Sequence, residues 1–68
     1  MDVTVKLSRN NEVKKIQLET GSRGKDVLKK INLKPDTVII MRDNHPIPID
    51  EEIKDGQELT ILKVSSGG

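Results

Sequence analysis

Apolar and polar residues alternate through the first part of the chain. In residues 2–8 the apolar positions are Val3, Val5 and Leu7, and this period of two predicts a half-buried β-strand. Four polar residues follow, two of them Asn, and they are typical of a hairpin connection because Asn tolerates a left-handed backbone. In residues 13–18, Ile16 and Leu18 alternate with polar residues while Val13 falls out of phase, and we predict that this segment forms the return strand of the hairpin.

The spacing then changes from that of a strand to that of a helix. Val27, Leu28 and Ile31 form one apolar face with lysines outside it, which predicts an α-helix over about residues 23–31. Ser22 is the expected N-cap, without a capping box because a lysine stands where the box needs Glu. An Asn and a Pro beyond the apolar face are expected to end the helix.

Two more strands are predicted in the second half, with an extended segment between them. Residues 37–42 are apolar on both faces and predict a third strand. Residues 45–49 hold two prolines, which cannot donate to a β-ladder, so we place this segment at a sheet edge. We expect a short helical turn in residues 50–53 and a final strand in residues 59–64.

The order of these elements indicates an α+β fold, with one main helix packed on one face of a mixed sheet. With the last strand parallel to the first and between its neighbours, this is the β-grasp arrangement. We expect residues 1–64 to form the domain and residues 65–68 to form a flexible C-terminal tail. The predicted core comprises Val3, Val5, Leu7, Leu18, Val27, Leu28, Ile31, Ile40, Leu59 and Ile61.

Composition narrows the possible function classes. The chain has 68 residues, a net charge of +1, one His, no Cys and no Phe, Tyr or Trp. It therefore has no disulfide framework and no thiolate, and we expect neither an enzyme nor a bound metal. Lys14, Lys15, Lys29 and Lys30 lack aromatic neighbours for base stacking, so we expect no nucleic-acid partner. Without a signal peptide or an apolar run of spanning length, we expect a cytoplasmic protein with no membrane partner.

The last four residues are small: Ser65, Ser66, Gly67 and Gly68. Glycine leaves the backbone unhindered, so such a tail can thread a narrow channel in a partner and present the α-carboxylate of Gly68 there. A carboxylate is unreactive until it is activated, for example as an acyl-adenylate. We interpret Gly68 as the reacting residue, Gly67 as the residue that keeps the tail slim, and the two serines as spacers that enter the partner. The alternative is a frayed terminus without a task.

The second half of the chain resembles a known family. Residues 38–48 (VIIMRDNHPIP) and 55–62 (DGQELTIL), followed by Gly67 and Gly68, resemble the ThiS/MoaD sulfur-carrier family of ubiquitin-like β-grasp proteins. The small archaeal modifier proteins belong beside that family. The resemblance covers nearly the whole chain, but Arg-Asp-Asn stands where the family has Val-Asn-Gly, and Arg-Gly stands where its helix opens with Thr-Val.

The resemblance implies a function for the tail. In that family an ATP-dependent, ubiquitin-activating-like enzyme adenylates the terminal glycine carboxylate, which would be that of Gly68. The product is a thiocarboxylate for a sulfur-accepting synthase in thiamin, molybdopterin or tRNA thiolation, or an isopeptide with a lysine of a target protein. ATP and magnesium belong to the partner, so the chain, a monomer when alone, is expected to bind no cofactor itself. The sequence leaves three roles open: a sulfur carrier, a protein modifier, and a β-grasp interaction module that never reacts.

A second candidate site lies on the third and last predicted strands. By analogy with the family, Val38 and Ile40 are buried, so Ile39 and Met41 face away from the helix, as Leu62 does. One small helix covers only one sheet face, so these three side chains would form an exposed patch suited to docking an activating enzyme. The alternative is the reversed phase, with Ile39 and Met41 in the core.

Overall fold

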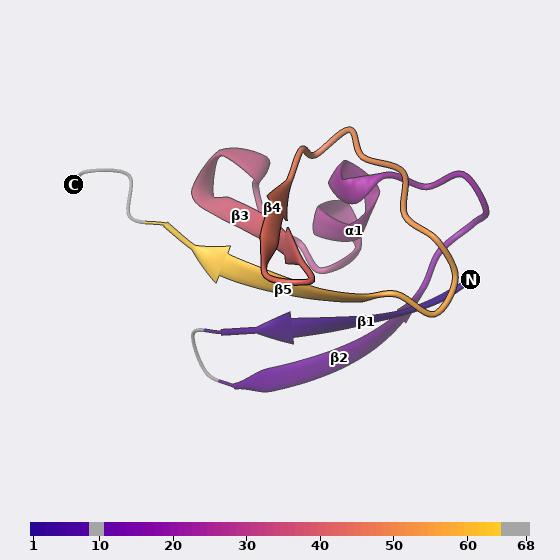
Figure 1. Ribbon diagram of the computed structural model, residues 1–68, viewed down its shortest axis with the longest axis horizontal. Coiled ribbons are helices and arrows are strands. Elements are labelled where there is room, and N and C mark those ends of the chain that lie inside the picture. Colours follow the sequence, from indigo (N-terminus) through magenta and orange to yellow (C-terminus); the bar gives the residue numbers. More distant parts are fainter. Residues whose placement is uncertain (9–10, 65–68) are drawn as a thin grey trace.

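A mixed β-sheet with a helix across one face makes up the described part of the chain (Figure 1). The computed structural model describes residues 1–8 and 11–64. In chain order the elements are β1 (Asp2–Leu7), β2 (Glu12–Gln17), α1 (Gly24–Lys30), the 3-10 helix η1 (Pro35–Thr37), β3 (Val38–Arg42), β4 (His45–Ile47) and β5 (Glu58–Lys63).

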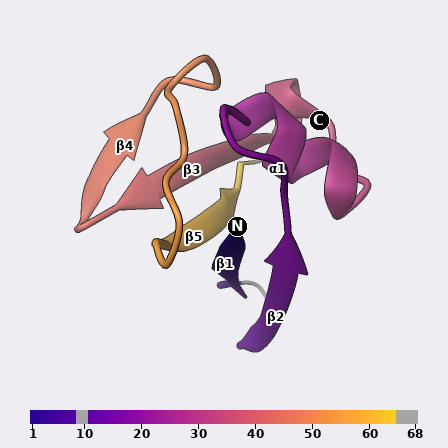
Figure 2. The same cartoon turned by 90° about the vertical axis from the view of Figure 1, so that its right-hand side faces the viewer.

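The last strand lies at the centre of the sheet. The spatial order is β2-β1-β5-β3-β4, with β5 parallel to β1 and antiparallel to β3. Val5 lies opposite Leu59 in the parallel pair, and Ile40 lies opposite Ile61 in the antiparallel pair. Figure 2 looks roughly along these strands and shows α1 on one side of the twisted sheet. The predicted β-grasp order, with the final strand parallel to the first, is confirmed.

The core lies between α1 and the inner face of the sheet. The buried side chains are Val3, Val5, Val27, Leu28, Val38, Ile40, Ile53, Leu59 and Ile61. The three other residues of the predicted core are only partly buried and pack against its margin: Leu7, Leu18 and Ile31. The alternation that predicted the strands therefore identified most of the core, but it did not identify Ile53.

Ile53 comes from a long loop between β4 and β5, where we expected a short helical turn. The structure instead has a hydrogen-bonded turn slightly earlier, with the Glu51 N–H donating to the C=O of Pro48 at 3.0 Å, and the residues after it pair with the start of α1. The Ile53 N–H donates to the C=O of Ser22 at 2.9 Å, and Glu52 forms an isolated β-bridge with Arg23. This pairing carries the Ile53 side chain into the core.

The helix begins one residue later than expected. Ser22 is not the N-cap, because its hydroxyl donates to the C=O of Glu19 at 2.7 Å. Arg23 is the N-cap, and its N–H donates to the carboxylate of Asp26 at 2.8 Å. We expected no capping box at this end of the helix. The carboxylate half of a capping box is nevertheless present, because the shift by one residue places Asp26 at the third helical position.

The loop also satisfies amide groups that the first turn of a helix leaves without partners. The N–H of Gly24 donates to the C=O of Glu51 at 3.0 Å, and the N–H of Lys25 donates to the C=O of Ile49 at 2.8 Å. Backbone hydrogen bonds therefore fix the start of α1 to the loop, with donors from both segments.

The helix ends in a Schellman motif. Asn32 has a φ of 61°, the left-handed conformation that ends many helices. Its N–H donates to the C=O of Lys29, and the N–H of Leu33 donates to the C=O of Leu28 at 2.9 Å. The expected stop at an Asn is therefore confirmed, and Leu33 packs back onto the core.

The β3–β4 hairpin closes through two residues with left-handed backbones. Asp43 has a φ of 54° and Asn44 a φ of 64°, which is the type I′ turn that suits the twist of a two-residue hairpin. The turn brings Arg42 opposite His45. As predicted from its prolines, the following segment is an edge strand.

Candidate functional site

The chain is held in place up to the point where β5 ends. The N–H of Val64, the last described residue, donates to the C=O of Thr37 at 2.9 Å. On the other flank of β5, both the N–H and the hydroxyl of Ser8 donate to the C=O of Ile61, each at 3.2 Å. The domain therefore delivers its C-terminal segment from a fixed position.

The predicted tail residues follow directly. Ser65, Ser66, Gly67 and Gly68 lie outside the described residues, so their roles stay predictions. Figure 1 shows β5 running toward that end of the molecule, away from the N-terminus. Whatever binds the tail must approach this end, close to η1 and the β1–β2 hairpin.

The predicted apolar patch lies on the sheet face opposite the helix. Ile39 is 39% exposed and lies directly opposite Leu62 across the β3–β5 pair. Met41 and Leu62 are partly buried. Because Val38 and Ile40 are in the core, the predicted phase of β3 is confirmed and the reversed phase is excluded. That this surface binds a partner stays a prediction.

Val64 extends this surface toward the end of the chain. It is 36% exposed and stands two positions after Leu62, on the same face of the extended segment. We did not predict Val64 as part of the patch from the sequence. Its position two residues after Leu62 in an extended segment could have indicated that it belongs there. We call Ile39, Met41, Leu62 and Val64 together the outer-face patch.

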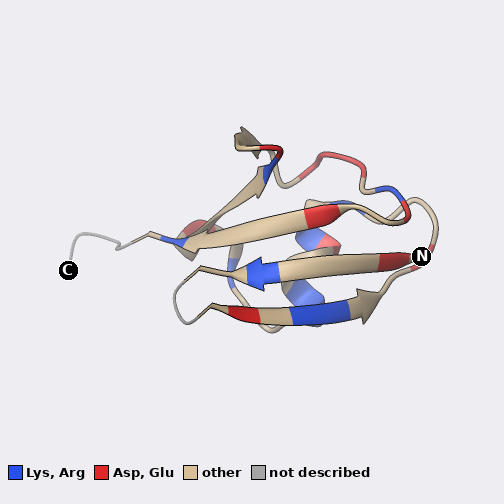
Figure 3. Ribbon diagram, turned by 60° about the horizontal axis from the view of Figure 1, so that its bottom comes forward, with Lys and Arg blue, Asp and Glu red and all other residues tan. Residues whose placement is uncertain are grey.

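Charged side chains border the outer-face patch at one end. Lys6 and Glu58 form an ion pair at 3.2 Å on the half of the sheet near the start of β5. Both side chains are largely exposed, so this pair adds little to stability. Figure 3 shows that β5 carries charged residues only at its two ends.

The described residues hold no group of three or more His, Cys, Asp or Glu side chains that could bind a metal ion. His45 lies exposed in edge strand β4, opposite Arg42 of β3. Across residues 1–8 and 11–64, no helix is long and apolar enough to cross a membrane. In the described residues, the end of β5 thus lies beside the apolar outer-face patch.

Comparison with known proteins gives the following similarities. A family model described as small archaeal modifier protein 2 matches residues 1–65. An uncharacterized protein from Archaeoglobus fulgidus is 34% identical over 56 residues, covering 81% of this chain and 82% of that protein. Sulfur carrier protein TtuB from Thermus thermophilus is 26% identical over 57 residues, covering 84% of this chain and 88% of TtuB.

Solved structures share the fold. A ubiquitin from Caldiarchaeum subterraneum superposes with a TM-score of 0.78 at 15% identity, covering 100% of this chain and 98% of that one. SAMP1 from Haloferax volcanii superposes with a TM-score of 0.75 at 16% identity, covering 100% of both chains. At such identities the likeness concerns the ubiquitin-like architecture alone.

Proposed function

This chain belongs to the small archaeal modifier protein 2 family, and from that premise we propose that it is a carrier whose C-terminal carboxylate is the reacting group. The observation that carries the proposal is the end of β5, which is anchored at Val64 beside the outer-face patch. The family match ends at Ser65, so the role of Gly67 and Gly68 rests on the sequence itself.

The proposed first step is adenylation of Gly68. One carboxylate oxygen attacks the α-phosphorus of ATP, a mixed anhydride forms, and pyrophosphate leaves. ATP and magnesium are held by the partner enzyme. The anhydride then accepts sulfide and releases AMP to give a thiocarboxylate, or accepts a lysine amine and releases AMP to give an isopeptide bond. The chain supplies the acyl group and the docking surface, while the partner supplies the catalytic groups.

The anchor at Val64 limits where the partner's active site lies. Four residues follow it, and an extended residue spans at most about 3.6 Å, so the terminal carboxylate reaches about 14 Å from the anchor. The activating enzyme must therefore contact the domain close to the end of β5. Ile39 and Leu62 lie at that end, which makes the outer-face patch the proposed docking surface.

The test is pyrophosphate exchange with the adenylating enzyme from the same cells. We compare the full chain with a chain ending at Gly67, which withdraws the carboxylate by about 3.5 Å. Because a misplacement of about 1 Å can cost a hundredfold in rate, we expect a loss of at least about that size. Ser66→Ala is the matched control, since it keeps the length and backbone of the tail, and we expect its exchange rate to stay close to that of the unmodified chain.

Equal exchange by the full and shortened chains would exclude the terminal-carboxylate mechanism and favour a β-grasp module that docks without reacting. Where exchange depends on Gly68, the intact mass of the protein from its own cells separates the two fates. One oxygen replaced by sulfur identifies the carrier, and a branched peptide on a lysine identifies the modifier.

A further inference from the structure

The two sides of the chain differ in chemistry where β5 ends. Leu62 and Val64 lie on the outer face and are apolar. Lys63, between them, lies on the helix side of the sheet, because side chains alternate along a strand and Ile61 is buried on that side. Lys63 is exposed and forms the blue end of β5 in Figure 3. The end of the strand is therefore apolar on one side and cationic on the other.

A second lysine lies beside the same end of β5. Thr37 of η1 accepts the N–H of Val64 through its C=O at 2.9 Å. The N–H and the hydroxyl of Thr37 both donate to the C=O of Lys34, at 3.1 and 2.8 Å. One hydrogen-bonded turn thus connects Lys34, whose side chain is exposed, to the end of β5. We call Lys34 and Lys63 the exit lysines.

The charges of the exit lysines are largely uncompensated. Neither lysine forms an ion pair with a residue that the structure describes. Asp36 in η1 is the one carboxylate in residues 31–41 and 59–64. Glu12 stands at this end of β2, but it already interacts with another group. The helix side of the exit therefore carries a net positive charge.

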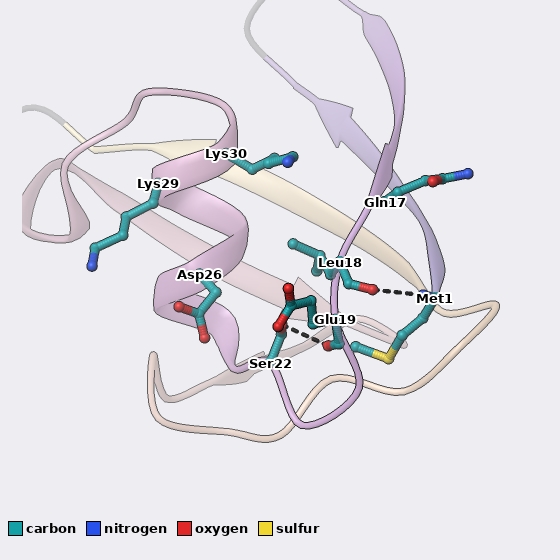
Figure 4. Close-up of a pocket in the computed structure, with 8 residues that line it drawn as sticks. All are labelled: Met1, Gln17, Leu18, Glu19, Ser22, Asp26, Lys29 and Lys30. Atoms are coloured by element: carbon teal, nitrogen blue, oxygen red, sulfur yellow. Dashed lines mark hydrogen bonds between the residues drawn. The ribbon is translucent and has the colours of Figure 1, made fainter.

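The lysines of α1 are in a different environment. Lys29 and Lys30 line a pocket of about 520 Å³ between α1 and the end of β2, together with Glu19 and Asp26 (Figure 4). Those two positive charges therefore share their pocket with two carboxylates. The exit lysines have one carboxylate nearby, so acidic side chains of a partner gain more at the end of β5 than at this pocket.

A protein that binds the tail has to approach both sides of the exit. Under the proposed function, on which this inference rests, the carboxylate of Gly68 reacts within about 14 Å of Val64. An active site that close requires the enzyme to surround the chain from the end of β5 onward. The outer-face patch then contacts the enzyme on one side of the chain, and the exit lysines lie against it on the other.

We propose that the exit lysines bind an acidic surface at the mouth of the activating enzyme's channel. The outer-face patch supplies apolar contact area on its side of the chain, but apolar contacts are not directional. Charge pairs on the helix side fix the register of docking and speed the encounter. The two contacts together orient the domain so that its tail enters the channel.

The phosphates of ATP fit these lysines less well. A lysine side chain has only four methylene groups and is much shorter than the extended tail. When the tail extends into the channel, the exit lysines lie at its mouth while the reacting phosphate lies at its far end. An acidic protein surface at the mouth suits this geometry, and a nucleotide at the far end does not.

The experiment is pyrophosphate exchange with the adenylating enzyme from the same cells, measured as the concentration of this protein is varied. Lys34→Glu and Lys63→Glu together should raise the KM for this protein by about tenfold, because two attractive contacts become repulsive. The kcat should stay close to that of the unmodified chain, and the increase in KM should shrink as salt is raised. Lys34→Arg with Lys63→Arg keeps both charges and should keep the KM.

Lys25→Glu with Lys54→Glu is the matched control, because it changes the net charge equally. Lys25 lies in the first turn of α1 and Lys54 in the loop that precedes β5. An equal increase in KM for this control pair would overturn the proposal, as would an unchanged KM after reversal of the exit lysines. A raised KM for ATP in place of a raised KM for this protein would overturn it in favour of direct contact with the nucleotide.

Direct binding separates this inference from the carboxylate mechanism. Titration calorimetry of the enzyme with the chain ending at Gly67, in the absence of ATP, measures docking without adenylation. Reversal of the exit lysines in that shortened chain should weaken the Kd by about tenfold, whether or not Gly68 reacts. An unchanged Kd, found together with exchange that depends on Gly68, would overturn this inference and leave the proposed function standing.

Discussion

Gly24 of α1 and Ile40 of β3 lie so close that a Cβ atom added to the glycine would be 2.9 Å from the Cδ1 atom of Ile40. The same Cβ would lie 3.1 Å from the carbonyl oxygen of Ile49. From the sequence, a glycine in the first helical turn reads as a weakness of the helix. In the structure it permits the helix to start directly against the sheet and the loop.

We therefore predict that Gly24→Ala destabilises the domain, although alanine is the better helix former by about 1 kcal/mol. Overpacking should lower the free energy of unfolding by about 1–3 kcal/mol, because the Ile49 carbonyl belongs to the backbone and yields less easily than a side chain. Urea unfolding measures the change, with Lys29→Ala on the exposed face of α1 as the control. A more stable Gly24→Ala variant would show that the loop moves aside at little cost.

Ile53 should contribute to stability as strongly as a residue of the central strand. It is 1% exposed, and Leu59 of β5 is 0% exposed, so truncation of either leaves a cavity in the core. We predict that Ile53→Ala and Leu59→Ala each lower the free energy of unfolding by about 2–5 kcal/mol. Denaturant unfolding tests this, with Ile39→Ala on the outer face expected to cost less than about 1 kcal/mol. A near-zero effect at Ile53 would show that the loop is dispensable for the core.

The β3–β4 hairpin is tied to the loop by one ion pair, which should make a modest contribution. Arg42 Nη2 lies 2.8 Å from Glu51 Oε2, with the two side chains 24% and 40% exposed. A double-mutant cycle with Arg42→Ala and Glu51→Ala should give a coupling energy of about 0.5–1 kcal/mol, smaller at high salt. Coupling that persists unchanged in 1 M salt would instead indicate a pair shielded from solvent.

The outer-face patch should matter for association more than for folding. Ile39→Glu and Leu62→Glu place charges on a surface that faces away from the helix, so we expect each to change the free energy of unfolding by less than about 1 kcal/mol. Binding to the activating enzyme should weaken by about tenfold or more, measured by titration calorimetry, because a buried apolar contact becomes an unpaired charge. Thr60→Glu changes a neighbouring position on the same face of the sheet. Its effect on the same binding measurement shows how far the patch extends toward β1. Unfolding by Leu62→Glu would instead assign that residue to the core.

Much of this fold was predictable because its signals are local. Alternation in residues 2–8 and the helical spacing of Val27 and Leu28 identify elements whose buried faces the structure confirms. The phase of β3 followed from a family resemblance that the family match has since confirmed. These predictions succeed because side-chain direction within a strand or helix depends only on residues a few positions away.

The errors lie where distant segments meet. Ile53 lies in an irregular loop, and the residues beside it in the sequence form no pattern that predicts the pairing of this loop with Ser22 and Arg23. The same pairing moves the start of the helix and frees Ser22 for a different hydrogen bond. At the candidate site, alternation located the outer-face patch, but the anchor of Val64 on Thr37 required the three-dimensional structure.

The position of β5 has a consequence for how the protein is made. Thr4 lies opposite Glu58, so the central pairing of the sheet joins segments far apart in the sequence and cannot form until β5 has been synthesised. A chain cut short before β5 leaves β1 and β3 with open inner edges and an uncovered apolar face, a state prone to aggregation and proteolysis. We therefore expect chains cut short before β5 to be cleared by proteolysis, so that the chains that persist carry the whole of β5.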